Sequence, residues 1–139
     1  MGWHWLDARP DARLLHNCAV FDLTGRHVAT VDAIDPVGGV AGEYYGALHL
    51  AGKQRAEDVV REDLLRALGL EVVVMLGPDL GDPSEFVERL ERAYERADVR
   101  ARRWTVEQPG WWTDTSTVAA RRALTGVRRE RLLRYRRAA

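Results

Sequence analysis

Cysteine and long apolar runs are nearly absent from this sequence of 139 residues. The single cysteine, Cys18, excludes an internal disulfide framework and a cysteine-rich zinc site. No apolar run approaches the roughly 20 residues that cross a bilayer. Residues 1–7 also lack the basic and apolar halves of a signal peptide. We therefore expect a cytoplasmic protein that has no membrane partner.

The formal net charge is zero, but the charge is unevenly distributed along the chain. Residues 1–99 carry 10 Arg and Lys against 18 Asp and Glu, whereas residues 100–139 carry 11 against 3. The length suffices for one domain with a substantial core. We therefore expect an irregular N-terminal segment (residues 1–16), an α/β domain (residues 17–99) and a basic, Trp- and Arg-rich helical extension (residues 100–139).

Three β-rich runs separated by turn residues predict a three-stranded antiparallel meander. The runs are Cys18–Leu23, His27–Asp32 and Val40–Tyr45. Thr24-Gly25 and the Asp-Pro-Val-Gly-Gly stretch at 35–39 supply the two turns.

Helical periodicity replaces the strand pattern after residue 50. Between Lys53 and Leu68, apolar residues recur at the spacing of an amphipathic helix, with charged residues elsewhere around it. The apolar positions are Ala56, Val59, Val60, Leu64, Ala67 and Leu68. The continuous apolar run Leu70–Leu76 is typical of a central strand covered on both faces. A second helix is expected from Asp82-Pro83-Ser84 to about Ala97, which gives the order β-β-β-α-β-α.

Two carboxylates of the meander are candidates for a metal site. Asp32 lies near the end of the second run and Glu43 lies inside the third, so a hairpin can bring them together. Mg²⁺ or Mn²⁺ is held by one or two carboxylates and keeps waters that meet a substrate phosphate. The alternative is that both are ordinary strand-end carboxylates that face solvent.

Several short pieces between residues 17 and 97 resemble, in order and spacing, the small Vsr-like endonuclease domain. This domain belongs to the PD-(D/E)XK, restriction-endonuclease-like superfamily and occurs in uncharacterised, often actinobacterial, antitoxin-related proteins. The pieces are Val20-Phe21-Asp22, Gly25-Arg26, Val31-Asp32, Gly42-Glu43-Tyr44-Tyr45-Gly46, His49, Gln54-Arg55, Asp58, Arg61, Leu68-Gly69 and Val72-Val73-Val74.

The resemblance implies a restriction-endonuclease-like fold and metal-dependent hydrolysis of DNA phosphodiesters. It makes Asp32 and Glu43 the ligands of Mg²⁺ or Mn²⁺ and places His49 near the scissile phosphate. Tyr45 departs from the pattern, because relatives carry an acid or the superfamily's lysine there. A tyrosine with a pKa near its usual value of about 10 is a poor base at neutral pH.

Two other functions therefore stay open. One is a catalytically inactive relative that binds nucleic acid through arginines of the helix and the tail. The candidate nucleic-acid-binding residues are Arg55, Arg61, Arg128, Arg131 and Arg134. The other is an interaction module that binds a protein partner or a second copy of the chain around Trp111 and Trp112.

Overall fold

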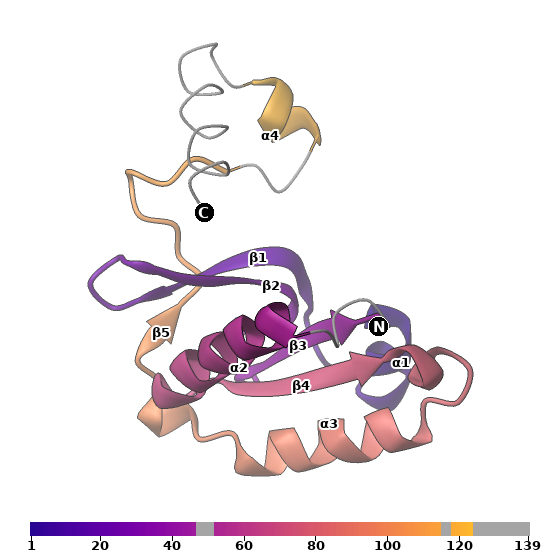
Figure 1. Ribbon diagram of the computed structural model, residues 1–139. Helices are drawn as coiled ribbons and strands as arrows, with labels where there is room; N and C mark the ends of the chain where they lie inside the picture. The colour runs from indigo at the N-terminus through magenta and orange to yellow at the C-terminus, as the bar shows by residue number, and fades with distance from the viewer. Residues whose placement is uncertain (47–51, 115–117, 124–139) are drawn as a thin grey trace. The chain divides into compact units, whose positions relative to one another are not determined.

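The computed structural model describes residues 1–46, 52–114 and 118–123 (Figure 1). The chain forms two compact units, Met1–Pro109 and Gly110–Ala139. The second unit contains the short helix α4 (Val118–Arg122). Within the described residues, no helix is both long enough and apolar enough to cross a membrane.

The first unit is built on a five-stranded sheet in the order β4-β3-β2-β1-β5. The strands are β1 (Leu15–Asp22), β2 (His27–Asp35), β3 (Val40–Tyr45), β4 (Glu71–Leu76) and β5 (Trp104–Thr105). The first three form the expected antiparallel meander, β4 runs parallel to β3, and β5 pairs antiparallel with β1. The sheet is therefore mixed and open, and the predicted α/β class is confirmed.

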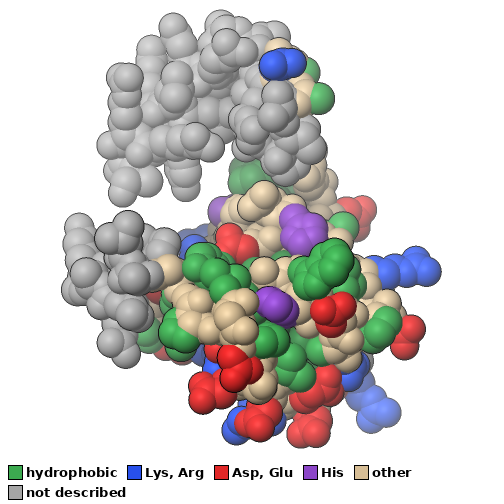
Figure 2. Space-filling model, turned by 90° about the vertical axis from the view of Figure 1, so that its right-hand side faces the viewer, with side chains coloured by type: hydrophobic (Ala, Val, Ile, Leu, Met, Phe, Trp, Pro, Cys, Tyr) green, Lys and Arg blue, Asp and Glu red, His purple; other side chains and the backbone are tan. Residues whose placement is uncertain are grey.

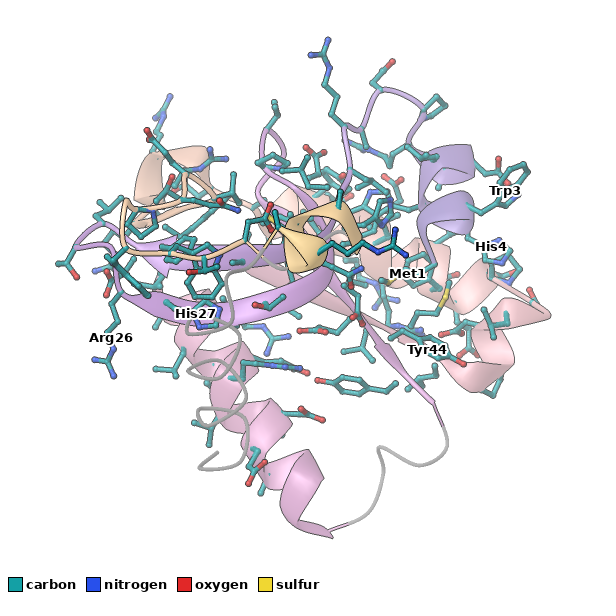
Figure 3. All side chains as sticks on the ribbon, turned by 90° about the horizontal axis from the view of Figure 1, so that it is seen from above. Met1, Trp3, His4, Arg26, His27 and Tyr44 are labelled. Atoms are coloured by element: carbon teal, nitrogen blue, oxygen red, sulfur yellow. The ribbon has the colours of Figure 1, made fainter. Side chains whose placement is uncertain are left out.

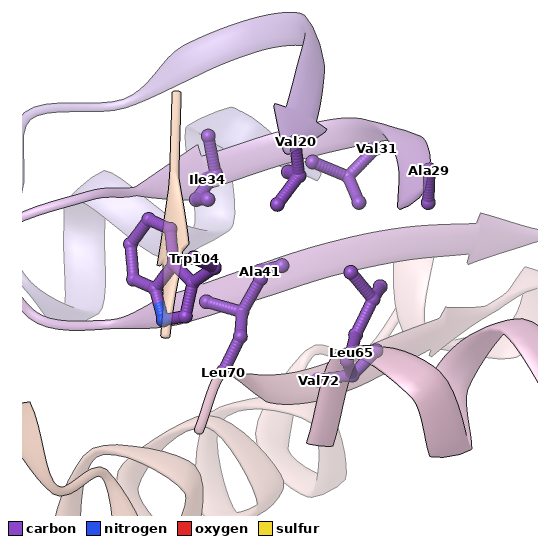
Figure 4. Packing of buried hydrophobic residues seen from close by; sticks show 9 residues of the cluster. All are labelled: Val20, Ala29, Val31, Ile34, Ala41, Leu65, Leu70, Val72 and Trp104. Carbon is purple, nitrogen blue, oxygen red and sulfur yellow. The ribbon is translucent and has the colours of Figure 1, made fainter. Parts of the chain in front are cut away.

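Helices cover both faces of this sheet (Figure 1). They are α1 (Gly2–Ala8), α2 (Gly52–Ala67) and α3 (Ser84–Arg96), with short 3₁₀ turns at Gly77–Leu80 and Val99–Ala101. One core cluster lies on the α2 side and consists of Val20, Ala29, Val31, Ile34, Ala41, Leu65, Leu70, Val72 and Trp104 (Figure 4). The opposite cluster consists of Trp5, Ala33, Val40, Val73, Met75, Phe86, Leu90 and Ala93.

Strand β4 lies at the edge of the sheet, so the predicted central position for residues 70–76 is wrong. Its apolar run is still explained, because Val72 packs on the α2 side and Val73 and Met75 pack on the other. A continuous apolar run thus reports cover on both faces of a strand and does not report its position within the sheet.

The first unit extends beyond the expected α/β domain (residues 17–99) at both ends. Residues 1–16, expected to be irregular, contain α1, and Trp5 of this helix is fully buried. Gly42 permits this contact, since a Cβ there would lie 2.6 Å from Trp5 Cζ3. At the other end, β5 adds Trp104 to the core, so the first unit continues to Pro109. Both elements are too short to produce a clear sequence period.

A buried carboxylate joins α1, the β2–β3 turn and α3. Asp35 Oδ1 accepts hydrogen bonds from the backbone N–H groups of Val37 and Gly38. Its Oδ2 accepts one of 2.7 Å from the hydroxyl of Tyr94, and this hydroxyl accepts one of 2.9 Å from Trp5 Nε1. Tyr94 is therefore the link between the turn and the N-terminal helix.

We expect Tyr94→Phe to lower the free energy of unfolding by roughly 1–3 kcal/mol, because it leaves Trp5 Nε1 and Asp35 Oδ2 without a partner. Urea denaturation measures this change. The matched control is Tyr44→Phe, at a partly exposed position of β3, which should stay within about 0.5 kcal/mol of the native protein. Equal stabilities of the two variants would contradict the role assigned to Tyr94.

Candidate functional site

At the end of the β2–β3 pairing, a hydrogen bond to the side chain of Asp32 takes the place of a hydrogen bond between the backbones of the two strands. The two strands pair from Asp35 with Val40 to Ala33 with Gly42. At the next position, Asp32 Oδ2 accepts a hydrogen bond of 2.8 Å from the backbone N–H of Tyr44. This register places Asp32 beside Glu43 on the neighbouring strand.

Strand β2 departs from regular alternation at the same place. Val31 and Ile34 are three residues apart, yet both belong to the core cluster on the α2 side. Regular alternation would send them to opposite faces of the sheet. On β1, Asn17 adopts a left-handed φ of 47° between Cys18, the partner of Val31, and His16, the partner of Ala33. An irregularity of the two strands therefore adjoins Asp32.

Helix α2 turns its charged side toward the sheet. Asp58 is buried, and Arg61 and Glu62 are partly buried. The apolar side of this helix is instead exposed, by 49% at Val59, 59% at Val60 and 52% at Leu64. The apolar side of an amphipathic helix normally faces the core, so the sequence pattern alone gives the wrong orientation.

Arg61 bridges two buried carboxylates. Its Nη2 lies 3.1 Å from Glu43 Oε1 and 3.3 Å from Asp58 Oδ1. The side chains of Glu43 and Asp58 are 5% and 12% exposed, whereas that of Arg61 is 33% exposed. Among the described residues, Glu43 Oε1, Asp58 Oδ2 and Arg61 Nε have no hydrogen-bond partner. One guanidinium thus compensates two carboxylates incompletely.

Burial raises the pKa of the Glu43 carboxyl to about 8, although the positive charge of Arg61 acts in the opposite direction. The negative charge of Asp32, a side-chain hydrogen bond with Asp32 and the charge of Asp58 raise this pKa further. The Glu43 carboxyl therefore holds its proton more tightly than an exposed glutamate does. Desolvation acts to lower the pKa of Arg61, but the charge of Glu43, a hydrogen bond with Tyr45 and the charge of Asp58 together raise it, so Arg61 stays a cation.

Tyr45 completes the cluster on the α2 side of the sheet. Its hydroxyl donates a hydrogen bond to Glu62 Oε1 and also interacts with Arg61. Desolvation, followed by the bond to Glu62, raises the pKa of Tyr45 well above its usual value. Tyr45 therefore stays neutral and acts as a hydrogen-bond donor, whereas a general base must lose its proton. Sequence analysis gave no role to Glu62, although its charge four residues after Asp58 places both on one side of the helix.

The other predicted site residues lie elsewhere or outside the described part of the chain. His49, Arg128, Arg131 and Arg134 fall outside it, and so does the side chain of Arg55 in α2. Two residues without a predicted functional role, Arg26 and His27, lie at the far end of the β1–β2 hairpin from Tyr44 (Figure 3). Trp104 is a core residue, whereas Trp111 of the second unit is 63% exposed. The cluster thus consists of Asp32, Glu43, Tyr45, Asp58, Arg61 and Glu62.

The carboxyl groups of Asp32 and Glu43 are of the chemical type that binds a hard cation such as Mg²⁺. No group of three or more His, Cys, Asp or Glu side chains within residues 1–46, 52–114 and 118–123 is arranged to hold a metal ion. Mg²⁺ needs fewer protein ligands, because water and substrate phosphate complete its coordination. Asp32 and Glu43 have the right chemistry, and Glu43 Oε1, which forms an ion pair of 3.1 Å with Arg61 Nη2, makes no hydrogen bond among the described residues. The residues therefore fit such an ion.

Charged side chains of both signs are mixed on the face of the molecule drawn in Figure 2. Acidic and basic groups alternate over its lower part, and hydrophobic groups lie above them (Figure 2). The described residues on this face therefore form no continuous basic surface.

No protein-family model matches the chain, and neither a curated protein nor a solved structure matches it significantly. The resemblance to Vsr-like endonuclease domains therefore remains a prediction from sequence. What is established is an α/β unit with a five-stranded mixed sheet and a buried charge cluster under α2.

The raised pKa of Glu43 predicts a stability that depends on pH. Because folded Glu43 holds its proton more tightly than the unfolded chain does, the free energy of unfolding should fall as pH rises from about 4.5 to about 8. We expect Glu43→Gln to flatten this decline in urea denaturation across that range. Glu71→Gln, which removes a surface partner of Arg96, should keep the decline. Identical pH profiles for both variants would contradict the assignment.

Proposed function

We propose that the first unit is a nuclease-like domain in which Asp32 and Glu43 bind Mg²⁺ or Mn²⁺ and DNA phosphodiester bonds are hydrolysed. The observation that carries the proposal is the orientation of α2, which faces the sheet with Asp58, Arg61 and Glu62 and exposes Val59, Val60 and Leu64. Burying an apolar side chain contributes about 1.5–3 kcal/mol. Since this helix leaves three apolar side chains exposed and packs its charged side against the sheet, the charged residues indicate a role in function and not in stability.

The topology supports the same proposal. The resemblance implies an antiparallel meander followed by α-β-α, and the first unit has this order. It also implies an acid at the end of the second strand and another in the third. Asp32 lies inside β2, three residues before its end, and Glu43 lies beside it in β3, which keeps the two acids close together. The arginine-rich residues 100–139 supply positive charge for a nucleic-acid backbone.

Each residue of the cluster has a distinct part in this chemistry. A bound divalent cation polarises a phosphoryl oxygen and lowers the pKa of a bound water. Asp32 and the deprotonated Glu43 would hold that cation. The guanidinium of Arg61, which is 33% exposed, would donate to a negatively charged phosphate. The neutral hydroxyl of Tyr45 positions Glu62 and Arg61, and His49 remains the predicted group beside the scissile phosphate.

Calorimetric titration with Mn²⁺, compared between the native protein and Asp32→Asn, tests the proposal without a guess about the substrate. We expect saturable binding in the native protein and a loss of at least about tenfold in affinity in the variant, because one of two carboxylate ligands is neutralised. Asparagine keeps an acceptor for the Tyr44 N–H, so the strands should stay paired. Magnesium-dependent cleavage of DNA should be lost in the same variant.

The matched control is Asp22→Asn. Asp22 forms a surface turn at the end of β1 and has no part in the cluster. This variant should bind Mn²⁺ as the native protein does. Absence of binding at millimolar metal in the native protein, or equal binding by Asp32→Asn, would rule out the metal site.

A second candidate function is a nuclease-fold protein without catalytic activity that binds nucleic acid or a protein partner. It is favoured by the ion pairs of Arg61, which already place a cation between Glu43 and Asp58, and by the neutral Tyr45.

This candidate predicts DNA binding that persists in a metal chelator and weakens as salt rises. Fluorescence anisotropy with a labelled duplex measures it, and deletion of residues 125–139 should remove most of the salt dependence because it removes clustered arginines. Unchanged binding after the deletion would show that these residues make no contact.

A further inference from the structure

The charge cluster under α2 has more acids than bases. Arg61 forms ion pairs with Glu43 and Asp58, and Asp32 adds a third carboxyl group beside Glu43. Glu43 is only 3% exposed, and its Oε1 has no hydrogen-bond partner among the described residues although Arg61 Nη2 lies 3.1 Å away. The cluster therefore contains more carboxyl groups than cations, so a further cation would help to compensate it.

Arg61 is more exposed to solvent than either of the acids with which it forms ion pairs. Its side chain is 33% exposed, against 5% for Glu43 and 12% for Asp58. Its Nη2 contacts both acids and the guanidinium also interacts with Tyr45, whereas its Nε is buried without a hydrogen-bond partner in the described part of the chain. A rotation of the side chain toward solvent would release both acids without moving α2.

We propose that Arg61 is an internal counter-ion that competes with a divalent cation for Glu43, so that the cation binds when the guanidinium is displaced. This inference rests on the proposed function. It makes Arg61 a positioning residue that sets the metal affinity of the site. A unit charge a few Å from a bound cation opposes it strongly in a partly buried environment. The acids are thereby kept compensated in the absence of metal, which limits the cost of burying them.

The test is a calorimetric titration of the full chain with Mg²⁺ in an alkaline buffer, in which protons compete least for the carboxylates. Arg61→Gln should bind Mg²⁺ at least about tenfold more tightly than the native protein. Arg61→Lys, which keeps the charge, should bind as the native protein does. The matched control is Arg66→Gln on the same helix, whose side chain contacts Glu62 and the carbonyl of Val72 and should not affect affinity.

The outcomes separate this inference from the proposed function. Saturable binding by the native protein and tighter binding by Arg61→Gln support it. Binding by Arg61→Gln alone, with none by the native protein, overturns it, because the cation then does not displace the guanidinium. Equal or weaker binding by Arg61→Gln overturns it and leaves the metal site of the proposed function intact. Absence of binding in every variant overturns both.

A second measurement on the native protein guards against misfolding of the variants. Nitrogen-15 spectra of arginine side chains report the environment of each guanidinium. On addition of Mg²⁺, the Arg61 resonance should shift toward that of a solvated arginine, and Asp32→Asn should lose this response. An Arg61 resonance that stays unchanged while Mg²⁺ saturates the protein would overturn the displacement.

Discussion

The guanidinium of Arg61 is the group on which the α2 side of the molecule depends. It lies between Glu43 of the sheet and Asp58 of its own helix, and it compensates two carboxylates that are almost fully buried. Removing one partner of a buried ion pair leaves an uncompensated charge and is strongly destabilising. Helix α2 contributes Leu65 to the buried core cluster. Because its apolar contacts are few, the ion pairs of Arg61 fix the orientation of the helix on the sheet.

The two faces of the sheet are held in different ways. On the side of α1 and α3, apolar packing of Trp5, Phe86 and Leu90 is fastened by the hydrogen bonds of Tyr94 and Asp35. On the α2 side, the core cluster gives way at Asp32 and Glu43 to charged groups. The well-packed side under α1 and α3 thus lies behind the charged cluster on the α2 side, and a binding or catalytic site requires such a packed support.

Much of the fold follows from the sequence, because strand alternation, turn residues and the inner face of α3 agree with one another. The sequence predicts that a hairpin can bring Asp32 and Glu43 together, and in the structure Asp32 accepts a hydrogen bond from the backbone of Tyr44, the residue after Glu43. The orientation of α2 did not follow, since Val60 and Leu64 suggest a buried side that the charges of Asp58 and Arg61 override. The position of β4 at the edge of the sheet was also mispredicted. An edge strand that helices cover on both faces has the same continuous apolar sequence as a central strand.

Crystals soaked in Mn²⁺ and measured at the manganese absorption edge test the central claim most directly. The account predicts an anomalous peak in contact with the carboxylates of both Asp32 and Glu43, together with an Arg61 side chain that has left Glu43. An Arg61 guanidinium still bridging Glu43 and Asp58 at saturating Mn²⁺, without a peak between the two strands, would contradict it.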